Sequence, residues 1–99
     1  MKIKIKDKEV TLVQKMRTLL IYEALANKPF NPQTITDVML YFYSTILACA
    51  GDVEMDFNEF LDWLDENPNQ FEIFNIWLSK ENKTESQFVD KEEKKKENH

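Results

Sequence analysis

The 99-residue sequence is poor in the residues from which many active sites are built, with one glycine, one cysteine and one histidine. A phosphate-binding loop needs several glycines, so that class of nucleotide site is excluded. An internal disulfide needs two cysteines, and Cys49 lies in the most apolar segment, so we expect a small core residue. Because the histidine is the last residue, His99, we expect no histidine-based catalysis or metal binding in the core.

The sequence also lacks an apolar run long enough to cross a membrane. Its most apolar stretch, from Val38 to Ala50, is shorter than the roughly 20 residues that a spanning helix needs. A short continuous run of this kind indicates a helix that is buried on most sides. The less hydrophobic residues of the stretch fall on one face of that helix, namely Tyr41, Ser44, Thr45 and Ala48.

Basic residues are missing from the middle of the chain. Between residues 29 and 79 there are nine acidic residues and no lysine or arginine, whereas residues 1–28 carry seven basic and three acidic residues. The acidic segment repels phosphates, so we expect no nucleic-acid partner. The two oppositely charged segments could attract each other between copies, or the acidic surface could simply keep the protein soluble.

The N-terminus reads as a β-hairpin. Residues 2–6 and 9–13 alternate between apolar and polar side chains, which is typical of strands with one buried face. If Asp7 and Lys8 form a two-residue loop, the facing pairs are Lys6 with Glu9, Ile5 with Val10, Lys4 with Thr11 and Ile3 with Leu12. The free edge of this hairpin is a possible docking site and a possible route to self-association. The alternating lysines leave no apolar signal segment, so a cytoplasmic location is the default expectation.

Four helices are predicted after the hairpin, over residues 14–27, 38–50, 57–66 and 68–80. The second has a candidate N-cap in Thr34 or Thr36, and Gly51 is placed where a left-handed C-cap would need a glycine. Asp56 and Glu59 have the spacing of a capping box, and so do Asn67 and Gln70. We therefore predict a mainly α (α+β) fold, with an N-terminal hairpin and about four short helices in a compact bundle.

The domain organisation follows from a change in composition near residue 80. Residues 1–79 contain the apolar material for one small core and are predicted to form a single domain. Residues 80–99 are dominated by charges of both signs, with Phe88 and Val89 as the only apolar pair, and are predicted to form a flexible tail.

Neither of two acidic clusters has the pattern of a metal or catalytic site. Residues 51–60 are similar to the second half of a calcium-binding EF-hand loop. In that alignment, however, Ala48 and Ala50 stand at positions that need oxygen ligands, and Val53 stands where the turn needs a glycine. The carboxylates of the third helix lie opposite its apolar face, where surface residues are expected: Asp62, Asp65 and Glu66. The sequence therefore predicts no metal site, no cofactor and no enzyme activity.

The last helix carries more apolar side chains than one small core needs. Phe71, Phe74 and Leu78 define one face, and further apolar residues widen it to an arc of roughly 220°. Such a helix either lies between neighbours or presents a second face to a partner. Trp63, at the border of the third helix's apolar stripe, adds an aromatic anchor of the kind found at interfaces. The candidate partner-binding residues are Trp63, Ile73, Ile76 and Trp77.

The order of these segments resembles a known family. A basic hairpin (KIKIKDKEVTL) precedes MRTLLIYEALANKPF and TDVMLYFYSTILACAG, and then come DFNEFLDWLDENP and a final FxxFxxWL pattern. This arrangement resembles the tail assembly chaperones of long-tailed phages and prophages, across about residues 1–80. The resemblance implies a small, mostly helical protein that binds the tape measure protein and keeps its long hydrophobic helices soluble. It also implies support for tail-tube polymerisation in the bacterial cytoplasm, with no retention in the virion.

The family often makes a longer product by ribosomal frameshifting near the end of this reading frame. Residues 94–96 are three lysines, where an A-rich slippery run of codons could lie. Two other functions remain open on the residues alone. One is an acidic mimic of DNA that inhibits a nucleic-acid enzyme, and the other is a generic helical protein-interaction module without a membrane or nucleic-acid partner.

Overall fold

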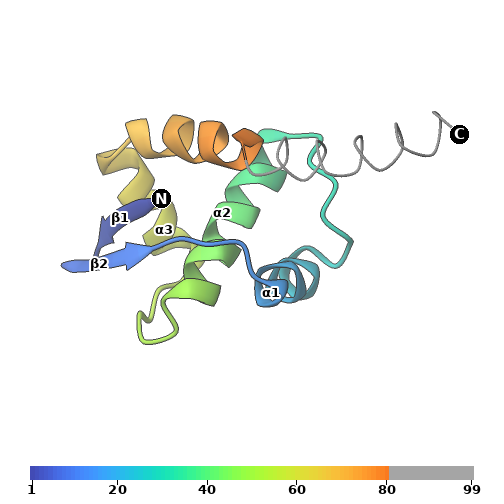
Figure 1. The fold of residues 1–99 in the computed structure, drawn as a ribbon, viewed down its shortest axis with the longest axis horizontal. Coiled ribbons are helices and arrows are strands. Elements are labelled where there is room, and N and C mark those ends of the chain that lie inside the picture. Colours follow the sequence, from blue (N-terminus) through green and yellow to red (C-terminus); the bar gives the residue numbers. More distant parts are fainter. Residues whose placement is uncertain (81–99) are drawn as a thin grey trace, which may run out of the picture.

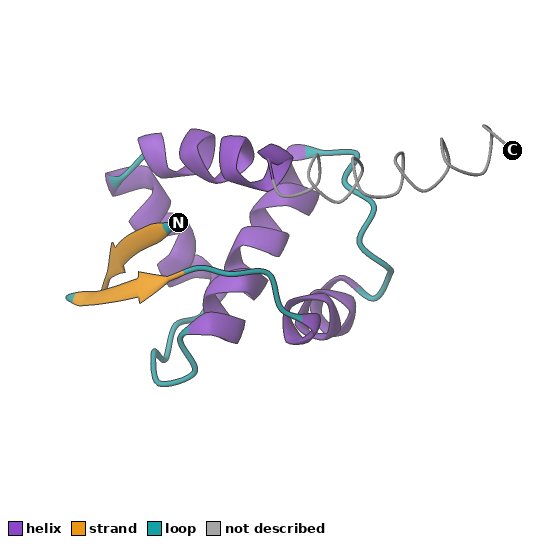
Figure 2. Ribbon diagram, viewed as in Figure 1, coloured by secondary structure: helices purple, strands orange, loops and turns teal. Residues whose placement is uncertain are grey.

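The computed structural model describes residues 1–80 and consists of a hairpin followed by four helices (Figures 1 and 2). Strands β1 (Lys2–Ile5) and β2 (Lys8–Thr11) form the hairpin. The helices are α1 (Met16–Ala26), α2 (Ile35–Cys49), α3 (Phe57–Glu66) and a helix over 69–80. The predicted fold class is therefore confirmed. The predicted charged tail lies, apart from residue 80, outside the described residues.

The hairpin register differs from the prediction. The turn is formed by Lys6 and Asp7, and Ile3 lies opposite Val10 while Ile5 lies opposite Lys8. Both turn residues have positive φ angles, 49° and 62°, as a type I′ turn requires. The predicted pairing is displaced from this one by two residues, and such a shift leaves every side chain on the same face. The alternation pattern could not distinguish the two registers.

The inner face of the hairpin forms part of the core. Ile3, Ile5, Val10 and Leu12 are all buried, as the alternation predicted. The backbone pairing of the hairpin extends one residue beyond the strands, because the N–H of Leu12 donates to the Met1 carbonyl at 2.7 Å. A two-stranded hairpin is marginal by itself in water, so this apolar face must be covered by helices.

Helix α2 runs through the middle of the molecule, with α1 on one side and the hairpin and α3 on the other (Figure 1). Six consecutive residues, from Tyr41 to Ile46, are buried, which confirms a helix covered on most sides. The face of Tyr41, Ser44, Thr45 and Ala48 is buried as well, and the Tyr41 ring lies 6.1 Å from that of Tyr22 on α1. The hydroxyls of Ser44 and Thr45 donate to the carbonyls of Leu40 and Tyr41, each at 2.8 Å, and so need no solvent.

Aromatic rings connect the helices around Phe42. Its ring stacks on Phe74 of the 69–80 helix, with centroids 4.1 Å apart and planes 2° apart. The edge of Phe60 of α3 meets it at 5.3 Å, and Trp63 meets it at 5.9 Å. One α2 side chain therefore joins α3 and the last helix to the same core.

Two of the predicted helix caps are present. Thr34 caps α2 in a reciprocal box with Asp37, and Asp56 caps α3 in a box with Glu59. The α3 boundaries, Phe57 to Glu66, agree with the prediction.

Two other cap predictions are wrong. Gly51 does not have a positive φ, and the C-cap of α2 is Ala50, with φ of −129°. The left-handed cap belongs instead to Asn27 after α1. Asn67 and Gln70 form no reciprocal box. The Asn67 amide donates back to the Trp63 carbonyl at 2.9 Å, and the Gln70 side-chain oxygen is buried without a partner among residues 1–80.

The basic hairpin meets part of the acidic middle within the same chain. Lys6 pairs with Glu59 at 2.8 Å and also donates to the Glu54 carbonyl, while Lys8 pairs with Asp52 at 2.5 Å. These contacts tie the hairpin tip to the segment between α2 and α3 and to the first turn of α3. Some of the charge attraction that the sequence suggested between copies is therefore satisfied inside one molecule.

Candidate functional site

Trp63 is part of the fold as well as of the surface. Its indole N–H donates to the backbone carbonyl of Lys4 at 3.0 Å, across 59 residues of sequence. The half-buried ring also lies against Phe42 and Phe60, at 5.9 and 6.2 Å between centroids. This tryptophan holds β1 against α3, and only its remaining surface is available to a partner.

Three of the candidate residues lie on the 69–80 helix and form one exposed apolar strip. Ile73 and Ile76 are 45% and 51% exposed, and they are three residues apart, which places them on one helix face. Trp77 is half-buried beside them, with its ring 5.6 Å from that of Phe74. The structure thus brings Ile73, Ile76 and Trp77 together, whereas Trp63 comes from α3.

Two neighbouring hollows adjoin this strip. The larger, of about 450 Å³, lies between the start of α2 and the 69–80 helix, and the smaller, of about 330 Å³, follows along the helix. Both are lined by Asn75, so we call them together the Asn75 hollow. Within residues 1–80, its lining residues are Pro32, Gln33, Thr34, Ile35, Val38, Phe71, Asn75, Ile76, Ser79 and Lys80.

Sequence reasoning missed Ile35 as a surface residue. It is the first residue of α2, directly after the N-cap Thr34, and it is 70% exposed at the rim of the hollow. The available signal was its position. Ile35 precedes the continuous apolar stretch that begins at Val38 and is separated from it by Thr36 and Asp37, so it lies outside the run that predicted a buried helix.

Helix α1 provides a second exposed apolar surface. It buries only Thr18 and Tyr22, against α2, so the apolar residues that surround it cannot all be covered. Met16 and Leu20 are 73% and 61% exposed, and Leu19 and Leu25 are exposed to a smaller extent. The sequence showed apolar residues around this helix but did not indicate which of them α2 would cover.

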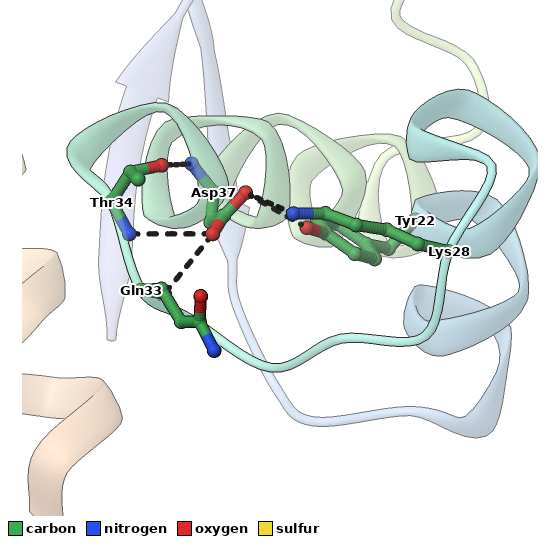
Figure 3. A network of polar contacts seen from close by, with 5 residues as sticks. All are labelled: Tyr22, Lys28, Gln33, Thr34 and Asp37. Atoms are coloured by element: carbon green, nitrogen blue, oxygen red, sulfur yellow. Dashed lines mark hydrogen bonds and ion pairs between the residues drawn. The ribbon is translucent and has the colours of Figure 1, made fainter.

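A buried carboxylate network connects α1 to the start of α2 (Figure 3). Asp37 is 6% exposed, and its Oδ1 accepts from the Lys28 ammonium at 2.9 Å and from the Tyr22 hydroxyl at 3.5 Å. Its Oδ2 accepts from the backbone N–H groups of Gln33 and Thr34, at 3.0 and 3.3 Å. The carboxylate is therefore satisfied on both oxygens by protein groups.

These contacts shift the pKa values of the network in opposite directions. The hydrogen bond from Lys28, followed by that from the Gln33 backbone, lowers the pKa of Asp37 to about 2. Burial, together with the charge of Asp37, raises the pKa of Tyr22, and the hydrogen bond to Asp37 raises the pKa of Lys28. A carboxylate that is ionised at neutral pH and hydrogen-bonded on both oxygens is suited to holding two helices together and is a poor general base.

The acidic face of α3 has the character expected from its sequence. Asp62, Asp65 and Glu66 are exposed, whereas Glu59 is held by its capping role and by Lys6, which lowers its pKa. Within residues 1–80, no group of three or more His, Cys, Asp or Glu side chains is arranged to hold a metal ion. In the same range, no helix has the length and apolar character needed to cross a membrane.

No protein-family model, curated protein or solved structure matched this chain in the comparisons made. Its function must therefore be argued from the surfaces described above.

Proposed function

We propose that this protein is a non-enzymatic tail assembly chaperone of a long-tailed phage or prophage, acting in the cytoplasm of the bacterial host. It would bind the hydrophobic helices of the tape measure protein, support polymerisation of the tail tube protein, and leave before the virion is complete. The observation that supports this proposal is the exposed apolar strip of Ile73, Ile76 and Trp77 beside the Asn75 hollow. An exposed apolar strip along a helix can pack against an apolar helix of a partner that would otherwise aggregate.

The distribution of charge supports a role in solubility. The carboxylates of α3 that carry no ion pair within residues 1–80 lie on a different helix from the apolar strip, so they would remain in water when a partner is bound. A complex covered by such a surface stays dispersed, as a chaperone for hydrophobic helices requires.

The second candidate, an acidic mimic of DNA, is less well supported. Such a mimic needs free carboxylates at phosphate-like spacing over a broad face. Three acids of the basic-free middle segment are already paired with lysines, namely Asp37 with Lys28, Asp52 with Lys8 and Glu59 with Lys6. A generic helical interaction module is the third possibility, and it shares the same apolar surface.

The gene neighbourhood gives the first test. We expect a long coiled-coil-rich reading frame just downstream, with an overlapping −1 frame at the codons for residues 94–96. A neighbourhood without tail genes would remove the support that the sequence resemblance gives, and the DNA-mimic proposal would then be tested by binding to DNA-handling enzymes. Binding by a mimic should fall steeply with salt, whereas binding through apolar faces should persist.

Co-expression with that downstream protein tests the surface itself. We expect the chain to raise the soluble fraction of the partner several-fold, and a variant with Ile73→Asp and Ile76→Asp to lose this effect. The matched control is Leu25→Asp, which changes an equally exposed apolar residue on α1. If the control loses the effect to the same degree, or the wild-type chain has no effect, the proposed surface is wrong.

A further inference from the structure

A further hollow, of about 310 Å³, lies between the tip of the hairpin and helix α3, and we call it the Trp63 hollow. Ile5 and Lys6 line it from the hairpin, Met55 lines it from the segment before α3, and α3 supplies the remaining wall. Ile5 and Met55 are buried and give the hollow an apolar floor. Within residues 1–80, it shares no lining residue with the Asn75 hollow, so the two are separate sites.

Helix α3 supplies an acidic and aromatic wall. With successive residues placed 100° apart around the helix, its lining residues fall within an arc of about 100°: Glu59, Asp62, Trp63 and Glu66. Asp65 lies on the same helix outside this arc and does not line the hollow. The indole of Trp63 therefore shares one helix face with three carboxylates.

The Trp63 hollow already holds one cation of this chain. The Lys6 ammonium pairs with Glu59 at 2.8 Å and also donates to the Glu54 carbonyl. Asp62 and Glu66 are exposed, and within residues 1–80 neither belongs to an ion pair. Since the charges of Lys6 and Glu59 cancel, the lining keeps two carboxylates in excess and attracts a second cation.

The Trp63 ring is held in one orientation at the side of the hollow. Its N–H donates to the Lys4 carbonyl at 3.0 Å, and the ring lies against Phe60. It is half-buried, so part of its surface remains accessible from the hollow. Lys4 is exposed but does not line the hollow, which leaves Lys6 as the lining cation within residues 1–80. An aromatic surface next to unpaired carboxylates suits a cation carried on an apolar stem.

We propose that the Trp63 hollow binds an arginine side chain of a partner polypeptide. The guanidinium lies against the indole and donates to Asp62 and Glu66, and its methylene stem contacts Met55. These two carboxylates are four residues apart on the helix, so the several N–H donors of one guanidinium can reach both. A planar guanidinium also stacks on an aromatic ring, which favours arginine over lysine.

This contact goes beyond the proposed chaperone function. It lies on α3 and the hairpin, outside the apolar strip of the last helix, and it requires no tape measure protein. Asp65 remains in water when the hollow is occupied.

A peptide titration tests the proposal on the full chain. The probe is the blocked tripeptide Ac-Ala-Arg-Ala-NH2, added to the ¹⁵N-labelled protein at constant ionic strength and followed by NMR. We expect the Trp63 indole N–H signal to shift and saturate, with a dissociation constant of about 1–50 mM for this single exposed contact. The signal is assigned by its loss in Trp63→Phe, and the Trp77 indole signal, which should not shift, is the internal reference.

Matched variants separate the hollow from the general acidity of the chain. Asp62→Asn and Glu66→Gln should each weaken binding at least threefold. Asp65→Asn removes the same charge from the same helix outside the hollow and should keep binding within about 1.5-fold of the wild type. All three residues are exposed, so each variant should keep the circular dichroism of the wild type.

Matched probes test the chemistry of the ligand. Replacing arginine by citrulline, which has the same shape without the charge, should weaken binding at least tenfold, and lysine should bind at least twofold more weakly than arginine. No saturable shift up to 100 mM probe, equal binding of citrulline or lysine, or an equal loss in Asp65→Asn would each overturn the proposal. Because the chain is tested with a peptide alone, these results do not depend on the chaperone function.

Discussion

The rings of Phe42 and Phe74 lie parallel, with centroids 4.1 Å apart and both side chains fully buried. Phe74 comes from the 69–80 helix and Phe42 from the centre of α2, so this stack fixes the last helix to the core. The exposed apolar strip of Ile73, Ile76 and Trp77 lies on the outer side of that helix. Phe74 also approaches Tyr41, at 6.3 Å between ring centroids, so the position of the candidate site depends on the aromatic contacts of Phe74 beneath it.

We predict that Phe74→Ala costs about 3–5 kcal/mol in the free energy of unfolding, because it removes a buried ring and leaves a cavity. Phe74→Leu, which keeps most of the volume, should cost less than half of this. Urea denaturation followed by circular dichroism measures both. Ile73→Ala is the control on the exposed side of the helix, and a loss there as large as that of Phe74→Ala would show that the strip is part of the core.

The Asp37 network predicts a specific loss of stability in acid. The pKa of Asp37 is about 2 in the folded chain and 3.8 when unperturbed. The stabilisation from its ionised form is therefore complete above pH 3.8 and is lost as the pH falls toward 2. Asp37→Asn should be less stable than the wild type at pH 7, and the difference should shrink between pH 3.8 and 2.

Urea midpoints at pH 7, 4, 3 and 2 check this prediction, with Asp65→Asn as an exposed control. The control should follow the wild type at every pH. A stability difference for Asp37→Asn that stays constant down to pH 2 would show that the Lys28 contact does not hold the carboxylate ionised.

Gly51 is predicted to tolerate a side chain. It does not have a positive φ, and a Cβ atom added there would have nothing within 4 Å. Gly51→Ala should leave stability unchanged or raise it by up to about 1 kcal/mol, because it restricts the unfolded chain. A loss of more than 1 kcal/mol in urea denaturation would show that this position needs glycine after all.

At Asp7 in the hairpin turn, in contrast to Gly51, we expect glycine to be the more stable residue. Its φ of 62° is the left-handed conformation, which glycine adopts without a steric penalty. Asp7→Gly should therefore raise the thermal midpoint, by an amount equivalent to about 0.5 kcal/mol, and leave the Lys6 contacts in place. Glu9→Gly, in the middle of β2, is the matched control and should lower stability by a similar amount. A decrease for Asp7→Gly would contradict the assigned turn.

Trp63→Phe separates the structural role of Trp63 from a role in binding. The change removes the indole N–H that donates to the Lys4 carbonyl but keeps an aromatic ring against Phe42. We expect a loss of about 1 kcal/mol in stability and faster hydrogen exchange in β1, with partner binding unchanged. Weaker partner binding at unchanged stability would instead make Trp63 a direct contact residue.

Local signals in the sequence were sufficient for most of the fold. The two reciprocal caps and the continuous apolar run placed α2 and α3, because each rests on contacts between residues close in the chain. The hairpin register was not fixed in this way, since a shift of two residues keeps Ile3, Ile5, Val10 and Leu12 on one face. The observed register places Lys6 and Asp7 in the turn with positive φ angles, and in it Lys6 and Lys8 pair with Glu59 and Asp52.

The candidate site could be predicted only in part. Ile73 and Ile76 stood out because the last helix had more apolar residues than its core face needs. The Asn75 hollow could not be predicted, because it forms where residues 32–38 contact residues 71–80. Local sequence patterns do not indicate contacts between segments so far apart in the chain. Trp63 illustrates the same limit, since its partner Lys4 lies 59 residues away in sequence.

The contact between Lys4 and Trp63 also sets an order for folding during synthesis. The hairpin is the first element to be made, yet its covering residues on α3 come only after residue 56. A lone hairpin is not stable in water, and closing a loop of this length costs entropy before any contact is gained. The hairpin can therefore become stable only after α3 has been synthesised. A nascent chain that ends before α3 should have no stable native hairpin.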